Sequence, residues 1–338
     1  MSSETVNNHH SVVYALAYFR QIYGGRVEIN VAGETRIVRL TDEPLAVEAL
    51  HLAWSRDGRH WAALNDNRPI LPEVWLRDPF INRGPDGWFH LLATGGRGPR
   101  DCLYLRSRDL VTWPEPRSLP LMESVPQANN IWAPEWFYDE PSDEYFLLWS
   151  SSFRDAGWKE SCLWCCRTRD FQSFSPPMVL FEPPYSVIDG TLLLHDGTYY
   201  LFHKEEEFGA ARGERRAIRL ATSPNIEGPY ALHDGPLNRG AHGGQIVPVI
   251  TEGPSVMPDP QGRGWLLLYD FCMGNDYGVS RSPDLWRWSE ESEVSFPPNA
   301  RHGSVFAITP EELARLQEAF TGCTACGAAA CVCPTTSP

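Results

Sequence analysis

The chain has 338 residues, of which 42% are hydrophobic and 12% aromatic, and its formal net charge at pH 7 is −14. A surface this acidic repels nucleic acid and anionic membranes, so neither is expected as a partner, whereas a neutral substrate is compatible with it. The high counts of glycine (27), proline (29) and tryptophan (13) favour many short strands and tight turns over long helices.

The first ten residues, MSSETVNNHH, have neither the basic segment nor the apolar segment of a secretory signal. No apolar stretch is long enough to span a membrane, so a cytoplasmic location is expected. We expect residues 1–10 to be disordered, residues 11–320 to form one folded domain, and residues 321–338 to form a low-complexity, disordered tail. One domain of this length is ordinary for barrels and propellers.

A first half-unit recurs four times along the chain. Each copy starts with an acidic residue, passes through a small residue or proline into an apolar strand, turns, and ends in an aromatic-rich strand. The copies are RDPFINRGPDGWFHLLATGG (77–96), APEWFYDEPSDEYFLLWSSS (133–152), IDGTLLLHDGTYYLFHKEEE (188–207) and EGPSVMPDPQGRGWLLLYDF (252–271). The leading acids are Asp78, Glu135, Asp189 and Glu252, and a fifth strand start, RHGSVFAI (301–308), has His302 in the lead position.

A second half-unit consists of a strand, then Ser or Thr, then Asp or Asn, then an aromatic residue. Its copies are LAWSRDGRHW (52–61), LRSRDLVTW (105–113), CRTRDFQSF (166–174), LATSPNIEGPY (220–230) and VSRSPDLWRW (279–288). Half-units at this period are typical of a β-propeller with four strands per blade. Five copies of one half-unit and five starts of the other predict an all-β, five-bladed propeller.

The offset between the half-units predicts how the ring closes. The segment SVVYALAYF (11–19) and strands near 36–40 and 52–54 would complete a blade with GSVFAI (303–308), which removes free sheet edges. A two-sheet sandwich is the alternative fold, but a sandwich does not need periodic acidic residues. After the last strand, Thr309 and Glu312 form a capping-box pattern that predicts a short C-terminal packing helix.

The nine cysteines fall into two groups. Those in strand-like apolar context are expected to be buried, reduced thiols. They are Cys102, Cys162, Cys165, Cys166 and Cys272. The other four, Cys323, Cys326, Cys331 and Cys333, lie in the tail, where a four-thiolate zinc site is the alternative to an unstructured segment.

The leading carboxylates indicate a catalytic site. In a propeller the innermost strands begin at one end of the central channel, so Asp78, Asp189 and Glu252 should meet there. Like charges raise one another's pKa, and a raised pKa is what a general acid needs near neutral pH. Glycoside hydrolysis uses such a set: one acid protonates the leaving oxygen, one carboxylate activates water, and a third can keep the acid protonated and oriented.

The motifs resemble those of glycoside hydrolase family 43, five-bladed propellers that act on arabinose-, xylose- and galactose-containing glycans. The matching motifs are RDPFI (77–81), WAPEW (132–136), VIDGTLL (187–193), TEGPS (251–255) and RHGSV (301–305), within a resemblance that runs from about residue 11 to 320. It implies that Asp78 is the general base, Glu252 the general acid, and Asp189 the residue that modulates the acid's pKa. The family inverts the anomeric centre, which implies an Asp78–Glu252 carboxyl separation of about 6.5–9.5 Å.

Eight further residues are candidates for substrate binding, each with a purely structural role as the alternative. They are Trp132, Asn130, Glu135, Arg77, His203, Lys204, Arg301 and Trp75. We expect Trp132 to stack on a sugar ring and Trp75 to contact the leaving-group side. In the family, a histidine at the position of His302 faces a channel water or a calcium ion, and because neutral imidazole is a poor calcium ligand, a water-mediated contact is expected. No cofactor is required, and a structural calcium ion in the central channel is the one alternative.

The favoured hypothesis is an inverting glycosidase of the arabinofuranosidase or β-xylosidase type, with a carbohydrate substrate. A phosphorylase on the same propeller would need cations for phosphate, which Arg77, Arg301 and Lys204 could supply. Fructan-directed enzymes carry Asn-Asp-Pro-Asn and Glu-Cys motifs, and neither is present here. A non-catalytic carbohydrate-binding propeller would be expected to lack one of the three carboxylates, and all three are present. The sequence does not fix the sugar.

Overall fold

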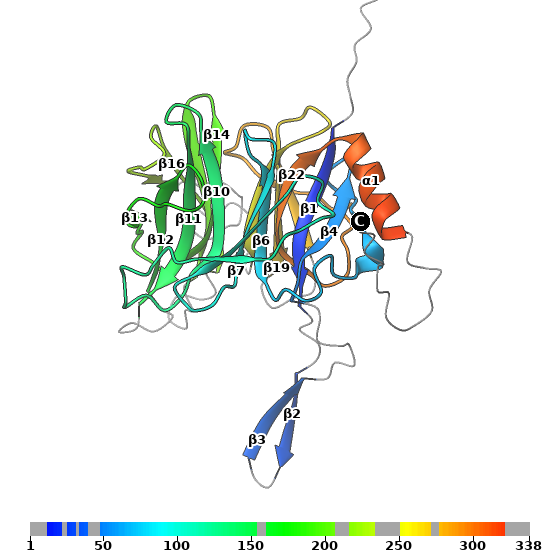
Figure 1. The fold of residues 1–338 in the computed structure, drawn as a ribbon, viewed down its shortest axis with the longest axis horizontal. Coiled ribbons are helices and arrows are strands. Elements are labelled where there is room, and N and C mark those ends of the chain that lie inside the picture. The colour runs from blue at the N-terminus through cyan, green and yellow to red at the C-terminus, as the bar shows by residue number, and fades with distance from the viewer. Residues whose placement is uncertain are drawn as a thin grey trace, which may run out of the picture.

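The computed structural model describes residues 12–21, 26–31, 34–39, 48–153, 160–206, 216–233, 251–271 and 277–321. Five four-stranded sheets form the blades of a propeller, and their innermost strands lie side by side around a central axis. Figure 1 shows the blades from the side, with the helix α1 (Pro310–Thr321) at the edge of the propeller. The predicted five-bladed, all-β fold is confirmed, and the two-sheet sandwich is excluded.

Each blade runs from an innermost strand to a short outer strand. Blade 1 is β22 (Ala300–Ile308), β1 (Val13–Arg20), β4 (His51–Ser55) and β5 (Ala62–Ala63). Blade 2 is β6 (Arg77–Arg83), β7 (Phe89–Thr94), β8 (Cys102–Ser107) and β9 (Arg117–Leu119). Blade 3 is β10 (Trp132–Asp139), β11 (Glu144–Ser152), β12 (Ser161–Thr168) and β13 (Met178–Phe181). Blade 4 is β14 (Val187–His195), β15 (Thr198–Glu205), β16 (Ala217–Ser223) and β17 (Ala231–Leu232), and blade 5 is β18 (Thr251–Pro258), β19 (Trp265–Phe271), β20 (Tyr277–Ser282) and β21 (Ser289–Glu290).

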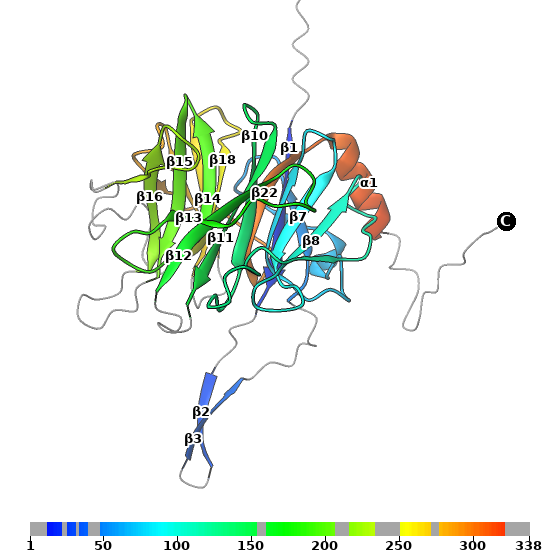
Figure 2. The ribbon, with the colours of Figure 1, turned by 60° about the vertical axis from the view of Figure 1, so that its left-hand side comes forward.

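The two ends of the chain close the ring within blade 1. β22 pairs with β1, and β1 pairs on its other side with β4, as predicted for residues 11–19, 52–54 and 303–308. The predicted contribution of residues 36–40 is wrong, because β4 already occupies the free edge of β1. Instead β2 (Arg26–Val31) and β3 (Glu34–Arg39) form a two-stranded sheet of their own, which Figures 1 and 2 show apart from the blades.

Every innermost strand carries a β-bulge near its start, where two residues lie opposite one residue of the neighbouring strand. The bulged pairs are Asp78–Pro79, Ala133–Pro134, Asp189–Gly190, Gly253–Pro254 and His302–Gly303. The first residue of the pair has a positive φ at Asp78 (50°), Ala133 (45°), Asp189 (54°) and Gly253 (62°). A bulge bends a strand and re-aims its side chains, so these positions direct groups toward the channel.

In two of the five blades, the acidic residue that the sequence repeat placed in the lead position does not occupy the first position of the bulge. Asp78, Asp189 and His302 share the first bulge position, as predicted. Glu252, however, comes one residue before its bulge, and Glu135 comes directly after its own. The sequence repeat was aligned on its acidic residues, whereas the structural equivalence of the blades follows from the backbone hydrogen bonds between strands. By these hydrogen bonds, Ala133 and not Glu135 is equivalent to Asp78 and Asp189.

The second half-unit forms the turn that ends the third strand of each blade. In blade 2 the Ser107 hydroxyl accepts the N–H of Leu110 at 2.9 Å, and Asp109 Oδ1 accepts two further backbone N–H groups at 3.0 and 2.7 Å. Trp113 Nε1 donates to the Leu110 carbonyl at 3.0 Å. The same set recurs with Ser55, Asp57 and Trp61 in blade 1. In blade 5, Ser282 Oγ accepts the Asp284 N–H at 3.2 Å, Asp284 Oδ1 accepts two backbone N–H groups, and Trp288 Nε1 donates to the Leu285 carbonyl. This half-unit therefore has a structural role: it stabilises the turn after the third strand of the blade.

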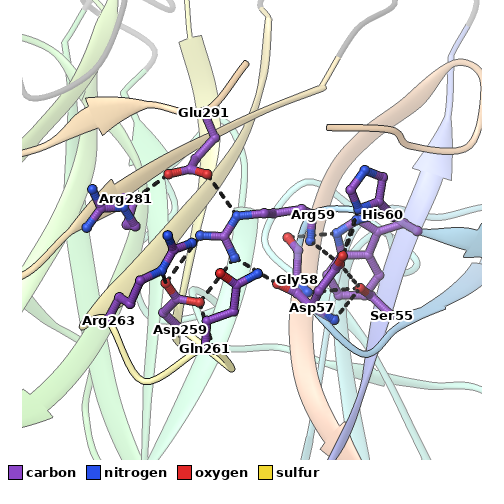
Figure 3. A network of polar contacts seen from close by, with 11 residues as sticks. Ser55, Asp57, Gly58, Arg59, His60, Asp259, Gln261, Arg263, Arg281 and Glu291 are labelled. Atoms are coloured by element: carbon purple, nitrogen blue, oxygen red, sulfur yellow. Dashed lines mark hydrogen bonds and ion pairs between the residues drawn. The ribbon is translucent and has the colours of Figure 1, made fainter. Parts of the chain in front are cut away.

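An ion-pair network joins the first blade to the last (Figure 3). Arg59, in the turn after β4, is buried and donates to both carboxylate oxygens of Asp259, at 3.1 and 3.2 Å. Its Nε donates to Glu291 at 2.8 Å, and Arg281 and Arg263 contact the same two acids from blade 5. The network therefore joins blade 5 to blade 1, the blade in which β1 and β22 from the two ends of the chain pair.

The predicted C-terminal helix is confirmed as α1. The Glu312 N–H donates to Thr309 Oγ1 at 3.2 Å, and the Thr309 N–H donates to Glu312 Oε2 at 2.9 Å, which is the predicted capping box. Leu313 and Leu316 are buried in the core between blades 1 and 2. No helix in the described part of the chain is long and apolar enough to cross a membrane.

Four of the nine cysteines lie in the part of the chain that the structure describes. The four cysteines of the described strands are buried free thiols, as predicted: Cys102, Cys162, Cys165 and Cys166. Cys272 and the four tail cysteines of the alternative zinc site lie outside the described residues, as do residues 1–10 and the predicted tail beyond Thr321.

Candidate active site

A cavity of about 260 Å³ lies at the end of the channel where the innermost strands begin. It brings together nine residues that the sequence predicted for the site: Asp78, Asp189, Glu252, His302, Arg77, Lys204, Arg301, Trp75 and Trp132. A larger cavity of about 510 Å³ lies beside it and shares Glu206, but the three predicted catalytic carboxylates do not line it. We therefore take the smaller cavity as the candidate active site.

Asp78 is oriented from two neighbouring blades. The Thr94 hydroxyl, at the end of β7, donates to Asp78 Oδ2 at 2.5 Å. Thr94 Oγ1 in turn accepts the N–H of Ala133, on β10, at 2.8 Å. The other oxygen, Oδ1, lies 3.4 Å from His302 Nδ1, and the Asp78 side chain is 16% exposed. The carboxylate is thus held in one orientation while solvent can still reach it.

His302 lies between two carboxylates. Its Nδ1 is 3.4 Å from Asp78 Oδ1 and 3.7 Å from Asp189 Oδ2. Burial opposes the charged imidazolium, but the carboxylates of Asp189 and Asp78 outweigh it and raise the pKa of His302. Asp189 itself is fixed by the Gly253 N–H, which donates to Oδ2 at 3.2 Å, and by its own N–H, which donates to Ser150 Oγ at 3.0 Å.

Glu252 is held between two cations. Lys204 Nζ donates to Glu252 Oε2 at 2.7 Å, and Arg301 Nη2 donates to Oε1. Lys204 also contacts Glu206 Oε2 at 2.6 Å, and Arg301 Nε donates to Asp270 Oδ2 at 2.9 Å. Burial alone would raise the pKa of Glu252, but Lys204 and Arg301 hold it well below its usual range.

Other carboxyls in the cluster have raised pKa values. Burial raises the pKa of Asp189 to about 6, although His302 and Lys204 oppose the shift. Burial, together with the charge of Glu252, raises the pKa of Asp270 to about 7. The expected rise in pKa therefore occurs at Asp189, whereas Glu252, the predicted acid, is ionised in this geometry because its cations are in direct contact.

Three predicted binding residues lie outside the cavity lining. Asn130 is buried, and its Oδ1 accepts the Ser152 N–H at 3.0 Å. His203 is buried with Nε2 2.9 Å from the Tyr185 hydroxyl, and burial lowers its pKa to about 3. Glu135 is also buried, which raises its pKa to about 8. None of the three is among the residues that line this cavity, so a role in substrate binding stays a prediction for them.

Sequence reasoning missed the residues that hold the carboxylates in place. Thr94 and Asp270 occupy the same position as Lys204 on the second strand of their blades, opposite the residue that precedes each bulge. The segments FHLLAT, WLLLYD and YYLFHK each end at this position, so an alignment of the second strands could have found it. Glu206, which follows β15, has no such repeat signal.

A structural calcium ion in the central channel, contacted by His302 through water, stays a prediction. Within the described ranges, no group of three or more His, Cys, Asp or Glu side chains is placed to hold a metal. His302 Nδ1 faces two carboxylates that accept hydrogen bonds from the protein. No step below is routed through a metal.

Glycoside hydrolysis typically uses a pair of carboxyl groups that flank the scissile bond, and this cavity is lined by Asp78, Asp189 and Glu252. Residues 38–314 match the family described as "Probable glycosyl hydrolase domain", which is related to glycoside hydrolase family 43. The chain belongs to this family, as its motifs predicted. An α-L-arabinofuranosidase of Bifidobacterium longum subsp. longum is 27% identical over 165 residues, which cover 40% of this chain and 16% of that protein. The match thus spans a small part of that relative's length.

Solved structures share the fold. An endo-1,4-β-xylanase of Bacteroides thetaiotaomicron has a TM-score of 0.55 and 14% identity, over 76% of this chain and 90% of that chain. The glycoside hydrolase family 43 protein BlXynB of Bacillus licheniformis has a TM-score of 0.53 and 17% identity, over 86% of this chain and 60% of that chain. At these identities the likeness supports the fold alone.

Proposed function

We propose that this protein is an inverting glycoside hydrolase of the arabinofuranosidase or β-xylosidase type. The observation that carries the proposal is the convergence of Asp78, Asp189 and Glu252, from three different blades, on one cavity of about 260 Å³. Family membership and the similarity to an α-L-arabinofuranosidase support the substrate class. A small cavity favours an enzyme that accommodates one terminal or side-chain sugar.

In the proposed reaction Asp78 is the general base. Thr94 holds its Oδ2, so the carboxylate is oriented to take a proton from a water that attacks the anomeric carbon. Glu252 is the general acid and gives its proton to the leaving oxygen on the opposite face of the sugar. Trp132 and Trp75 line the same cavity and would bind the sugar rings.

Glu252 must take up a proton before it can act as an acid. We propose that a bound sugar hydroxyl draws Lys204 toward Glu206, its second partner at 2.6 Å, and so weakens its hold on Glu252. Asp189, with a pKa of about 6, carries a proton in part of the molecules near neutral pH. Its Oδ2 accepts the N–H of Gly253, the residue next to Glu252, which places this proton-holding carboxyl beside the acid.

Charge pairing disfavours the phosphorylase alternative. Each cation that could hold phosphate is already in contact with a carboxylate: Arg77 with Glu48, Lys204 with Glu252 and Glu206, and Arg301 with Glu252 and Asp270. A phosphate ion would have to displace these acids and would be repelled by Asp78 and Asp189.

The test is hydrolysis of aryl glycosides of arabinofuranose, xylose and galactose by the wild type and by Asp78→Ala and Glu252→Ala. We expect the wild type to cleave at least one of them, and each variant to lose about 10²–10⁴-fold in kcat/KM, because a positioned acid or base contributes this much. Asp284→Asn is the matched control, since Asp284 serves only a blade turn.

Three outcomes would contradict the proposal. A wild type that binds but cleaves none of the glycosides would be a carbohydrate-binding propeller. Full activity in Asp78→Ala or Glu252→Ala would refute the roles of these residues. Formation of a sugar phosphate on addition of inorganic phosphate would indicate a phosphorylase.

A further inference from the structure

One carboxylate behind the cavity wall holds three of the side chains that line the cavity. Glu48, just before β4, accepts the Trp75 indole N–H on Oε2 at 2.7 Å. Its Oε1 accepts Arg77 Nη2 at 2.5 Å and Gln21 Nε2 at 3.2 Å. Trp75, Arg77 and Gln21 belong to the lining, whereas Glu48 does not. Glu48 therefore touches the site only through other residues.

Trp75 is a large aromatic ring left open to solvent at this cavity. It is 56% exposed, although it lines the same space as Asp78 and Glu252. Its polar N–H is satisfied by Glu48, which leaves the apolar faces of the ring as its free surface. A ring with one end hydrogen-bonded and its faces exposed can cover the apolar face of a sugar.

Glu48 also fixes the backbone on which these groups lie. Its carbonyl accepts the Leu76 N–H at 3.1 Å, so main chain and side chain together hold the segment from Trp75 to Arg77. The Arg77 guanidinium lies 5.8 Å from the centre of the Phe19 ring, which gives it a second contact. These contacts bring the approach to β6 against the end of β1, so the position of Trp75 depends on the neighbouring blade.

We propose that Glu48 is a positioning residue that holds Trp75 as the sugar-stacking surface at the edge of the cavity, and so sets the affinity for the sugar bound there. The inference rests on the proposed function of the site. A hydrogen bond to an ionised acceptor is strong, and a ring already held in its binding orientation loses little freedom when a sugar stacks on it. Loss of Glu48 should therefore weaken binding and leave the chemical step intact.

The kinetic test compares Glu48→Ala, Trp75→Ala and the double variant with the wild type. We expect each single variant to raise KM about ten-fold with kcat within about two-fold, and the double variant to be no worse than Trp75→Ala, because both changes remove the same contact. Glu48→Gln keeps one oxygen, which can accept from the indole or from Arg77 but not from both, so it should restore only part of the affinity. The control is Glu144→Ala, since Glu144 also contacts two arginines, Arg167 and Arg169, but lies in blade 3 and does not line the cavity.

A second measurement follows Trp75 directly. In protein labelled with 5-fluorotryptophan, the Trp75 fluorine resonance is assigned from Trp75→Phe. We expect Glu48→Ala to move this resonance, and xylotriose or arabinotriose to move it in the wild type. An unchanged resonance in Glu48→Ala, no response to either trisaccharide, or fully additive effects on KM would overturn the inference. If no glycoside is cleaved, the proposed function fails, while the resonance still decides whether Glu48 positions a sugar-binding Trp75.

Discussion

At the residue scale, the charges around Glu252 decide when the site can react. Lys204 is almost fully buried and contacts both Glu252 and Glu206. A cation in contact with a carboxyl lowers its pKa by about one to three units, in keeping with the lowered pKa of Glu252. Arg301 acts in the same direction but also holds Asp270, so Lys204 is the cation that can be removed with less disturbance.

We predict that Lys204→Met raises the pKa of Glu252. An acid with a higher pKa stays protonated to higher pH, so the basic limb of the pH profile of kcat/KM should move upward by about one to three pH units. Lys204→Arg, which keeps the charge, should leave the limb near its wild-type position. The measurement is kcat/KM against pH on an aryl glycoside that the wild type cleaves.

The control for this prediction is Arg219→Met. Arg219 is a buried cation on the neighbouring strand β16, and it contacts Glu205, which does not line the cavity. Its loss should affect stability and leave the pH profile in place. A basic limb that stays fixed or moves downward in Lys204→Met would show that Lys204 does not control the proton on the catalytic acid.

At the element scale, the bulge near the start of each innermost strand aims the reactive side chains. Asp78 and Asp189 are first residues of bulges with positive φ, and Gly253 holds the same place in β18. Ala133 adopts a positive φ at the equivalent position of blade 3, so φ alone does not demand a glycine here. A Cβ built on Gly253, however, would lie 2.7 Å from His302 Cγ, so this glycine is needed for the close approach of His302. The bulge of blade 5 thus makes room for the histidine of blade 1.

We predict that Gly253→Ala displaces His302 and lowers kcat/KM by about 10²-fold, since small misplacements in a site cost that much. Gly262→Ala is the matched control: its φ is 69° and no atom lies within 4 Å of a Cβ there. It should cost about 1 kcal/mol in free energy of unfolding and leave activity unchanged. Equal activity in the two variants, measured alongside thermal unfolding, would refute the role given to the bulge.

Repetition made the elements predictable from the sequence. The aromatic-rich strands and the Ser-Asp turns recur with a regular period, so the blades and the capped helix could be predicted. The hairpin β2–β3 could not be separated from the blades, because its strands carry no repeat that shows their neighbour. The register of the bulges could not be predicted either, since an offset of one residue at Glu252 or of two at Glu135 leaves the acidic pattern almost unchanged.

At the scale of the whole molecule, ring closure brings the site together. Asp78, Asp189, Glu252 and His302 come from four different blades and meet in the closed ring, in which β22 pairs with β1 and Arg59 joins blade 5 to blade 1. The sequence could predict this convergence from the fold. It could not predict that Lys204 and Arg301 bind both oxygens of Glu252, because such contacts depend on side-chain geometry across blades.

The central claim is that the site hydrolyses a glycosidic bond through a water activated by Asp78. The most direct test is the anomeric configuration of the first-formed sugar, followed by ¹H NMR during cleavage of an aryl glycoside before the product mutarotates. We expect a product of configuration opposite to the substrate, because the water attacks the face away from the leaving group. A product that retains the configuration of the substrate would contradict it.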